Sequence, residues 1–279
     1  MPTSPSSPDD ADQEFDEPFL DTTPSRWSRI RRLGALGDKP PAELTPHERA
    51  AWRADFERFV TDYRSAIVAV VRVRQPHGDD AEQLADDFLA EVGAQSRSLR
   101  GASPEKCSFR RYLQGWLHNY GRVRHRRELT TEHRTRRAGN AYEHDPPDDA
   151  IAAREHHAWV RALVRRAVAR LHDHERPRKP LEDTHAFALA RFHGVPLPSD
   201  DAASAPTLTL DELVVATRIT RGGVKNRLTR ARELFRSFLE PLLRDTVESK
   251  SELRTEARWF FGVLDDQYPG LHEPGACGS

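Results

Sequence analysis

The 279-residue sequence has little cysteine, almost no excess charge and no long apolar segment, and each shortage excludes a class of protein. Two cysteines, Cys107 and Cys277, are too few for a disulfide framework. The longest apolar run, Ala66 to Val71, is far shorter than the roughly 20 residues that cross a bilayer. Nothing in the sequence resembles a signal peptide. We therefore expect a cytoplasmic protein that does not engage a membrane.

The formal net charge is only −1, although 31% of the residues are charged. Such a balance excludes a simple polycation that coats nucleic acid. The charges are unevenly placed, however, because residues 1–25 contain acidic side chains and no Lys or Arg, whereas residues 108–137 are rich in Arg. Local basic patches are therefore the relevant electrostatic feature of this chain.

Apolar residues recur at helical spacing through most of the sequence, and the sustained two-residue alternation of strands is absent. We predict an all-α protein with two small helical domains joined by a flexible linker. The predicted parts are a disordered acidic leader at 1–48, a first domain at 49–127, a linker at 128–150, a second domain at 151–244 and a carboxy-terminal helical extension at 245–279. Inside the leader, residues 22–33 have helical apolar spacing and form a candidate docking segment.

The segment at 108–128 combines large aromatic side chains with closely spaced arginines, which suits nucleic acid with unstacked bases. Aromatic rings stack on bases, and arginines bind the phosphate backbone. Tyr112 falls on the apolar stripe and is expected in the core, Trp116 fits core and stacking roles equally, and Tyr120 is the better stacking candidate. The candidate binding residues here are Arg110, Trp116, Asn119, Tyr120, Arg122, Arg124, Arg126 and Arg127.

The segment at 208–239 predicts a short helix, a turn and a longer helix, with Thr220 capping the second helix through the amide of Gly222 or Gly223. The second helix has one apolar and one basic face, which is typical of a DNA-binding helix-turn-helix. A helical bundle with a solvated basic face fits the same pattern. The candidate DNA-binding residues are Arg221, Lys225, Asn226, Arg227, Thr229, Arg230 and Arg232, with internal ion pairs to Glu233 or Asp211 as the alternative for Arg230 and Arg232.

Together, these segments resemble a sigma factor of the sigma-70 family, in the extracytoplasmic-function group that keeps only the second and fourth conserved regions. GDDAEQLADDFLAEV at 78–92 resembles the acidic helix that docks on the polymerase clamp. SPEKCSFRRYLQGWLHNYGRVRHRRE at 103–128 resembles the helix that melts and holds the −10 promoter element. LTLDELVVATRITRGGVKNRLTRAR at 208–232 resembles the helix-turn-helix of the fourth region, which contacts the −35 element.

The resemblance implies a transcription initiation factor, rather than an enzyme, that binds core RNA polymerase and promoter DNA without a cofactor or metal. An inhibitory partner protein is compatible with it but is not identified by the sequence. The implied polymerase-binding residues are Gln83, Asp86, Asp87 and Glu91.

Two short stretches depart from the family pattern. Cys107 and Ser108 replace a Gly-Arg pair before the aromatic helix, and Thr217 and Arg218 replace a Leu-Gly pair in the turn. If that turn requires a positive φ, Arg218 costs on the order of 1 kcal/mol relative to glycine.

Two other functions fit parts of the sequence. A metal-dependent nucleic-acid enzyme is suggested by clustered acids at 79–87 and by histidines near 156 and 172, but no complete H-E-x-x-H or cysteine ligand set is present. A helix-turn-helix regulator, or a sigma-like protein without initiation activity, would have the same DNA-binding residues. Such a protein would not bind core polymerase.

Overall fold

The computed structural model describes residues 26–39, 42–74, 80–94, 99, 108–133, 148–200, 205–244, 247 and 250–272, with the backbone alone described at 26–28, 125–133, 148–149 and 250. In these ranges every regular element is a helix, as predicted, and none of them is long and apolar enough to cross a membrane. The elements are α1 (Arg26–Gly37), α2 (Pro46–Arg74), α3 (Ala81–Ala94), α4 (Phe109–His133), α5 (Asp148–Glu175), η3 (Leu181–Asp183), α6 (His185–His193), α7 (Leu210–Thr217), α8 (Arg221–Arg244) and α9 (Lys250–Gln267).

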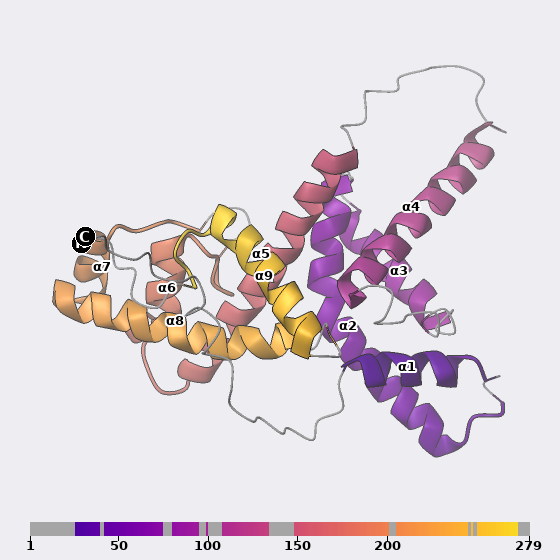
Figure 1. Cartoon of the computed structure of the whole chain (residues 1–279), viewed down its shortest axis with the longest axis horizontal. Coiled ribbons are helices and arrows are strands. Elements are labelled where there is room, and N and C mark those ends of the chain that lie inside the picture. Colours follow the sequence, from indigo (N-terminus) through magenta and orange to yellow (C-terminus); the bar gives the residue numbers. More distant parts are fainter. Residues whose placement is uncertain are drawn as a thin grey trace, which may run out of the picture.

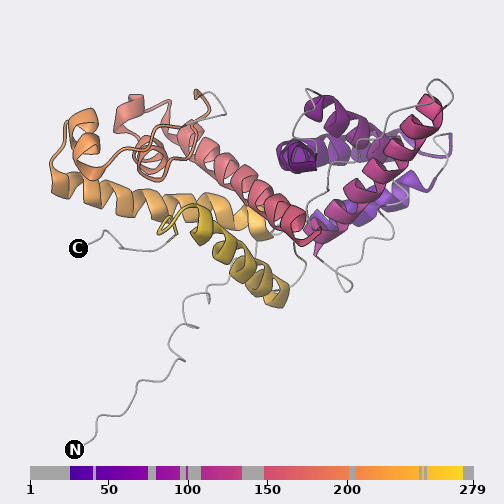
Figure 2. The same cartoon turned by 90° about the horizontal axis from the view of Figure 1, so that it is seen from above.

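The helices form two groups that share one long helix (Figure 1). Helices α1 to α4 lie together at one end, and α6, α7 and the start of α8 lie at the other. Helix α5 runs between the groups and packs on α2, α6 and α8, and α9 lies along α5 and α8 (Figure 2).

Aromatic side chains fill the core of the first group. Phe59 and Tyr63 of α2 pack against Phe109 of α4, with ring centroids 6.1 and 5.1 Å apart. Phe88 of α3 is fully buried, and the other apolar positions that the helical period of α3 predicts to face inward are buried too. Burial of one such ring contributes about 1.5–3 kcal/mol to stability, so these contacts fix α3 and α4 on α2.

The prediction of disorder throughout 1–48 is wrong for α1 and for the start of α2. Ile30 and Leu33 are 2% and 1% exposed, because their spacing places both on the face of α1 that packs on α2. Arg32 adds a bidentate ion pair to Asp55 of α2, at 2.5 and 2.8 Å. The candidate docking segment therefore docks within the chain itself, whereas residues 1–25 lie outside the described ranges.

Helical structure extends into the predicted linker, 128–150, from both sides. Helix α4 continues through His133, and α5 begins at Asp148. The first half of α5 packs on α2, where Trp159 contacts Tyr63 with ring centroids 6.1 Å apart. Arg166 of α5 also donates hydrogen bonds to the carboxylate and the backbone carbonyl of Asp62. The contacts of α5 therefore cross the boundary that the sequence predicts between the domains.

Candidate nucleic-acid interface

Two side-chain caps define the α7–α8 segment. The hydroxyl of Thr209 accepts a hydrogen bond from the Glu212 amide, and the Glu212 carboxylate accepts one from the Thr209 amide at 2.8 Å, which forms a capping box. The hydroxyl of Thr220 accepts a hydrogen bond from the Gly223 amide at 3.2 Å, so the predicted cap of α8 is confirmed. The segment is therefore a short helix, a tight turn and a long helix, as the sequence predicts.

The turn between α7 and α8 contains an unusual backbone conformation. Arg218 follows the last residue of α7 with a φ of 55°, and it is the one non-glycine residue with positive φ in the described ranges. An L-residue pays on the order of 1 kcal/mol there relative to glycine. The turn does adopt the left-handed conformation at Arg218, so the arginine that stands there in place of the family's glycine is strained.

Helix α8 has one buried and one exposed face. Its buried face has the helical period, and Val224, Leu228, Ala231 and Phe235 are all fully buried. On the other face, Asn226 is exposed and Lys225 is half-buried. Thr229 is half-buried and its hydroxyl donates to the Lys225 carbonyl at 3.2 Å, so its hydrogen bond is made within the helix. The outward residues at the start of α8 therefore form a polar and basic surface.

Two of the arginines on this surface have acidic neighbours. Arg221 lies 2.8 Å from Asp211, and Arg230 lies 2.6 Å from Glu233, which confirms the alternative considered for Arg230. All four side chains are at least half exposed, and pairs of this kind contribute about 0–1 kcal/mol. Replacing these carboxylates by phosphates as the partners of Arg221 and Arg230 would therefore cost little free energy.

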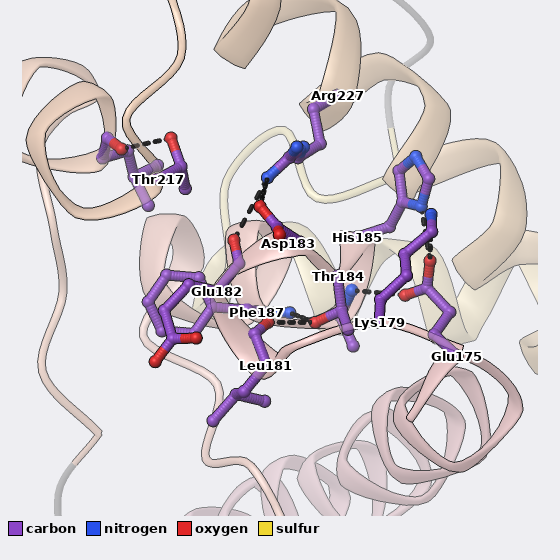
Figure 3. Close-up of polar contacts among 12 residues, drawn as sticks. Glu175, Lys179, Leu181, Glu182, Asp183, Thr184, His185, Phe187, Thr217 and Arg227 are labelled. Carbon is purple, nitrogen blue, oxygen red and sulfur yellow. Dashed lines mark hydrogen bonds and ion pairs between the residues drawn. The ribbon is translucent and has the colours of Figure 1, made fainter. Parts of the chain in front are cut away.

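Arg227 and Arg232 do not belong to the exposed face, which corrects the sequence prediction. The Arg227 side chain is 18% exposed, and its guanidinium donates to the Glu182 carbonyl at 3.1 Å and lies 3.9 Å from the Asp183 carboxylate (Figure 3). Arg232 is 1% exposed and lies beside Phe192 and His193 of α6. These arginines hold α8 against η3 and α6 and are not part of its exposed face.

Titratable groups in the same region hold α6 in place, and of these Glu175 is buried whereas His185 and His193 are half-buried. Burial, followed by the charge of Arg232, lowers the pKa of His193 to about 4. Burial opposes ionisation of Glu175, but hydrogen bonds from His185 and from the Ala186 amide outweigh it and lower the pKa of Glu175 (Figure 3). Polar contacts as well as apolar packing thus hold α6 against α5 and α8.

The second candidate surface lies on α4. Trp116 and Tyr120 are half-buried, and each ring meets Phe88 edge-on with centroids 5.6 and 5.5 Å apart. Asn119 and Arg122 are exposed, and neither makes a side-chain hydrogen bond or ion pair within the described ranges. Tyr112 packs on Phe109 at the edge of the core and is half-buried, like Trp116 and Tyr120. The surface therefore combines two partly accessible aromatic rings with an amide and a cation.

The remaining arginines of α4 differ in their surroundings. Arg124 forms an ion pair with Asp87 of α3 at 2.7 Å. The side chains of Arg126 and Arg127 lie outside the described ranges, although the helix itself continues past them. Among the described side chains, Arg122 and Arg124 form the basic end of α4.

Arg110 is not on the α4 surface, which is a second correction. It is 1% exposed, and its guanidinium lies 2.7 and 3.5 Å from the Glu256 carboxylate of α9. The same guanidinium lies 3.5 Å from the ring centroid of Trp259, whose ring meets His156 edge-on. Arg110 therefore joins α4 to the carboxy-terminal extension, a contact that no local sequence pattern indicates.

The predicted polymerase-binding residues lie on the outer side of α3 and have partners within the chain. Arg64 holds Asp86 at 2.7 and 2.8 Å and lowers its pKa, whereas Gln83, followed by Arg124, lowers the pKa of Asp87. Asp86 is exposed, and Asp87 and Glu91 are half-buried. This acidic surface lies next to the α4 surface, since Asp87 and Arg124 join the two.

No group of three or more metal-binding side chains is found among the described residues, so the structure offers no metal centre in that part of the chain. The chain matches no protein-family model, no curated protein and no solved structure in the comparisons made. The candidate function therefore depends on the chemistry of the two surfaces.

Proposed function

We propose that the chain is a transcription initiation factor that binds core RNA polymerase and directs it to promoters. The observation that carries the proposal is the presence, in one chain, of a capped helix-turn-helix with outward Lys225 and Asn226 and of a separate aromatic and basic surface on α4. The first surface suits base edges and phosphates in duplex DNA. The second suits bases that have left the duplex.

The α4 surface has the right parts for holding a melted strand. Tyr120 and Trp116 would stack on bases, Asn119 would hydrogen-bond a base edge, and Arg122 would bind the backbone. Stacking is worth about 1–3 kcal/mol per base, close to the few kcal/mol that unstacking costs. Because the free energies of stacking and unstacking nearly cancel, contacts with phosphates and with the polymerase must supply the net free energy that favours the open promoter.

The acidic surface of α3 is the proposed polymerase contact. Asp86 forms an exposed ion pair with Arg64, and Asp87 forms one with Arg124. Because exposed pairs of this kind contribute little, a basic surface of the polymerase can replace either arginine at low cost. Release of Arg124 from Asp87 would also add a cation to the α4 surface.

The proposal is tested by transcription in vitro. Core bacterial polymerase freed of other initiation factors is mixed with genomic DNA, with and without the purified chain, and the transcript 5′ ends are sequenced. We expect new start sites that share upstream sequence elements at two positions. The same set of start sites in the reactions with and without the chain would contradict the proposal.

A second function, that of a helix-turn-helix regulator without initiation activity, is favoured by one observation. The α5 packing and the buried Arg110–Glu256 pair hold the two helical groups together. A regulator needs only the α8 surface and tolerates a fixed arrangement, whereas an initiation factor uses both surfaces. The two functions are separated by binding to core polymerase, which only the initiation factor shows.

A further inference from the structure

An open pocket of about 450 Å³ lies at the junction of α5, η3 and α6. Its lining residues come from the end of α5 and the segment after it, from η3 and the residue that caps α6, and from the loop that follows α6. Pockets that hold small organic molecules in proteins have volumes of about 300–1,000 Å³. None of the lining residues belongs to the α8 surface or to the α4 surface, so the pocket is a separate candidate binding site.

The ionisable residues that line the pocket are all basic: His172, Arg176 and Lys179. Arg176 is exposed, and its guanidinium makes no hydrogen bond or ion pair within the described ranges. The Lys179 ammonium lies 3.7 Å from the Glu175 carboxylate, which His185 already contacts at 2.6 Å. Because a concave surface lined by one sign of charge attracts the opposite sign, the pocket favours an anion.

His172 is the buried member of this basic set, at 6% exposed. Its Nδ1 lies 3.2 Å from a carboxylate oxygen of Asp173, which holds the ring on that side. Nε2 makes no hydrogen bond to any described residue. A protonated imidazole donates through both ring nitrogens, so Nδ1 can bind Asp173 while Nε2 binds a ligand. His172 therefore offers a positioned donor that the contacts of the folded chain do not use.

The loop after α6 forms a fixed wall of the pocket. Asp200 accepts hydrogen bonds from Arg191 of α6 at 2.6 and 2.7 Å and from the Leu197 amide at 2.9 Å. These contacts close the loop that carries the lining residues Pro198 and Ser199. The Ser199 hydroxyl is exposed and has no hydrogen-bond partner among the described residues, so it is a further donor for a ligand.

The wall formed by η3 is fixed in a similar way. The Thr184 hydroxyl donates to the Leu181 carbonyl at 2.6 Å and accepts from the Phe187 amide at 3.0 Å (Figure 3). Arg227 of α8 holds the next residue of η3 by donating to the Glu182 carbonyl. A site whose walls are already ordered loses little conformational entropy when a ligand binds. The pocket is therefore largely preformed.

We propose that this pocket binds a small organic molecule that carries a phosphate group. Arg176 and Lys179 bind the phosphate as cations, and His172 donates a hydrogen bond to it. A phosphate monoester presents three acceptor oxygens, which suits donors that converge from separate segments. Leu181 and Pro198 supply apolar surface for the organic part of the ligand. The assignment does not depend on the proposed function, because neither nucleic-acid surface contributes to the pocket.

The test is isothermal titration calorimetry on the full-length chain in a buffer free of phosphate. The three probes are adenosine monophosphate, adenosine and inorganic phosphate. The variants are Arg176→Glu and Lys179→Met, and the matched control is Arg178→Glu. Arg178 is an exposed arginine of the same segment that does not line the pocket, so the control changes the net charge as Arg176→Glu does. Thermal unfolding checks that each variant is folded.

We expect adenosine monophosphate to bind the wild type at a single site, inorganic phosphate to bind more weakly at the same site, and adenosine not to bind. Arg176→Glu and Lys179→Met should each weaken binding of adenosine monophosphate roughly ten-fold or more, because each removes a charged partner of the phosphate. Arg178→Glu should keep the wild-type affinity within about two-fold.

A wild-type chain that binds neither adenosine monophosphate nor inorganic phosphate would overturn the proposal. Adenosine that binds as tightly as its monophosphate would also overturn it, since the phosphate would then make no contact. Equal losses in Arg176→Glu and Arg178→Glu would show a general attraction to a basic surface and no pocket site. All of these outcomes leave the proposed initiation function standing, because that function is tested by polymerase and promoter binding.

Discussion

Arg110 and Glu256 are separated by 146 positions in the sequence and form a buried bidentate ion pair that joins α4 to α9. Their side chains are 2% and 8% exposed, and Trp259 covers the guanidinium. The carboxy-terminal extension is thus an integral part of the helical packing. The helix that carries the proposed melting surface is held at its first turn by this extension.

Breaking this ion pair should destabilise the protein. We expect Glu256→Gln to lower the free energy of unfolding by about 3–5 kcal/mol, because it leaves the Arg110 charge buried without its partner. Replacing both residues by apolar ones, as Arg110→Met with Glu256→Leu, should recover most of the loss. Chemical denaturation measures both effects. A Glu256→Gln variant as stable as the wild type would show that the pair is open in solution.

Promoter opening should depend on Tyr120. If its ring stacks on one base, Tyr120→Ala removes about 1–3 kcal/mol, which is on the order of ten-fold in the open fraction. Permanganate reactivity of promoter thymines measures that fraction. Tyr120→Phe is the matched control and should retain opening, since it keeps both the stacking surface and the packing on Phe88. Unchanged opening in Tyr120→Ala would remove this residue from the mechanism.

The α8 surface should separate base recognition from phosphate binding. We expect Asn226→Ala to relax the preference at one base pair, with a discrimination loss of about 1–3 kcal/mol. Arg230→Ala should weaken binding to all sequences alike. Arg227→Ala, a control on the inner side, should reduce stability without altering base preference. Base preference is measured by selecting binding sites from a random library. An Asn226→Ala variant that kept the wild-type preference would show that Asn226 does not recognise a base.

Mild acid should destabilise the protein through His193. Its pKa is about 4 in the folded chain, against an ordinary value of 6.5, so the unfolded chain binds more protons between these limits. The stabilisation is complete above pH 6.5 and is lost as the pH falls toward 4, by up to about 1.4 kcal/mol per pH unit. The pKa of His156 is also lowered, by burial and then by Arg110, and acts in the same direction.

Denaturation midpoints at pH 7 and pH 5 measure this effect. His193→Asn should show a smaller loss of stability between the two values than the wild type, because it removes one of the protons involved. An identical pH dependence in the variant and the wild type would show that His193 is accessible to water.

The periodic apolar positions were predictable because helix packing follows local spacing. The inward face of α3, the buried face of α8 and the Thr220 cap all follow from residues within a few turns of each other. The helical spacing at 22–33 was recognised, but the packing of α1 on α2 was not predicted, because the acidic, proline-rich composition before Arg26 dominated the interpretation of the whole leader.

The inward arginines were not predictable, because their partners are distant in the sequence. Arg110 meets Glu256 of α9, and Arg227 meets the carbonyl of Glu182 in η3. An arginine has the same local pattern whether its tip reaches solvent or a buried carboxylate. Only the fold separates these arginines from the outward Arg122 and Arg221.

Co-elution with core RNA polymerase is the most direct test of the initiation-factor proposal. We expect the wild-type chain to elute with core enzyme as a one-to-one complex, and an Asp86→Asn, Asp87→Asn variant to lose most of that binding. Glu57→Gln, at an exposed acidic position on α2, is the control and should bind normally. A correctly folded wild-type chain that elutes apart from the core enzyme would contradict the proposal.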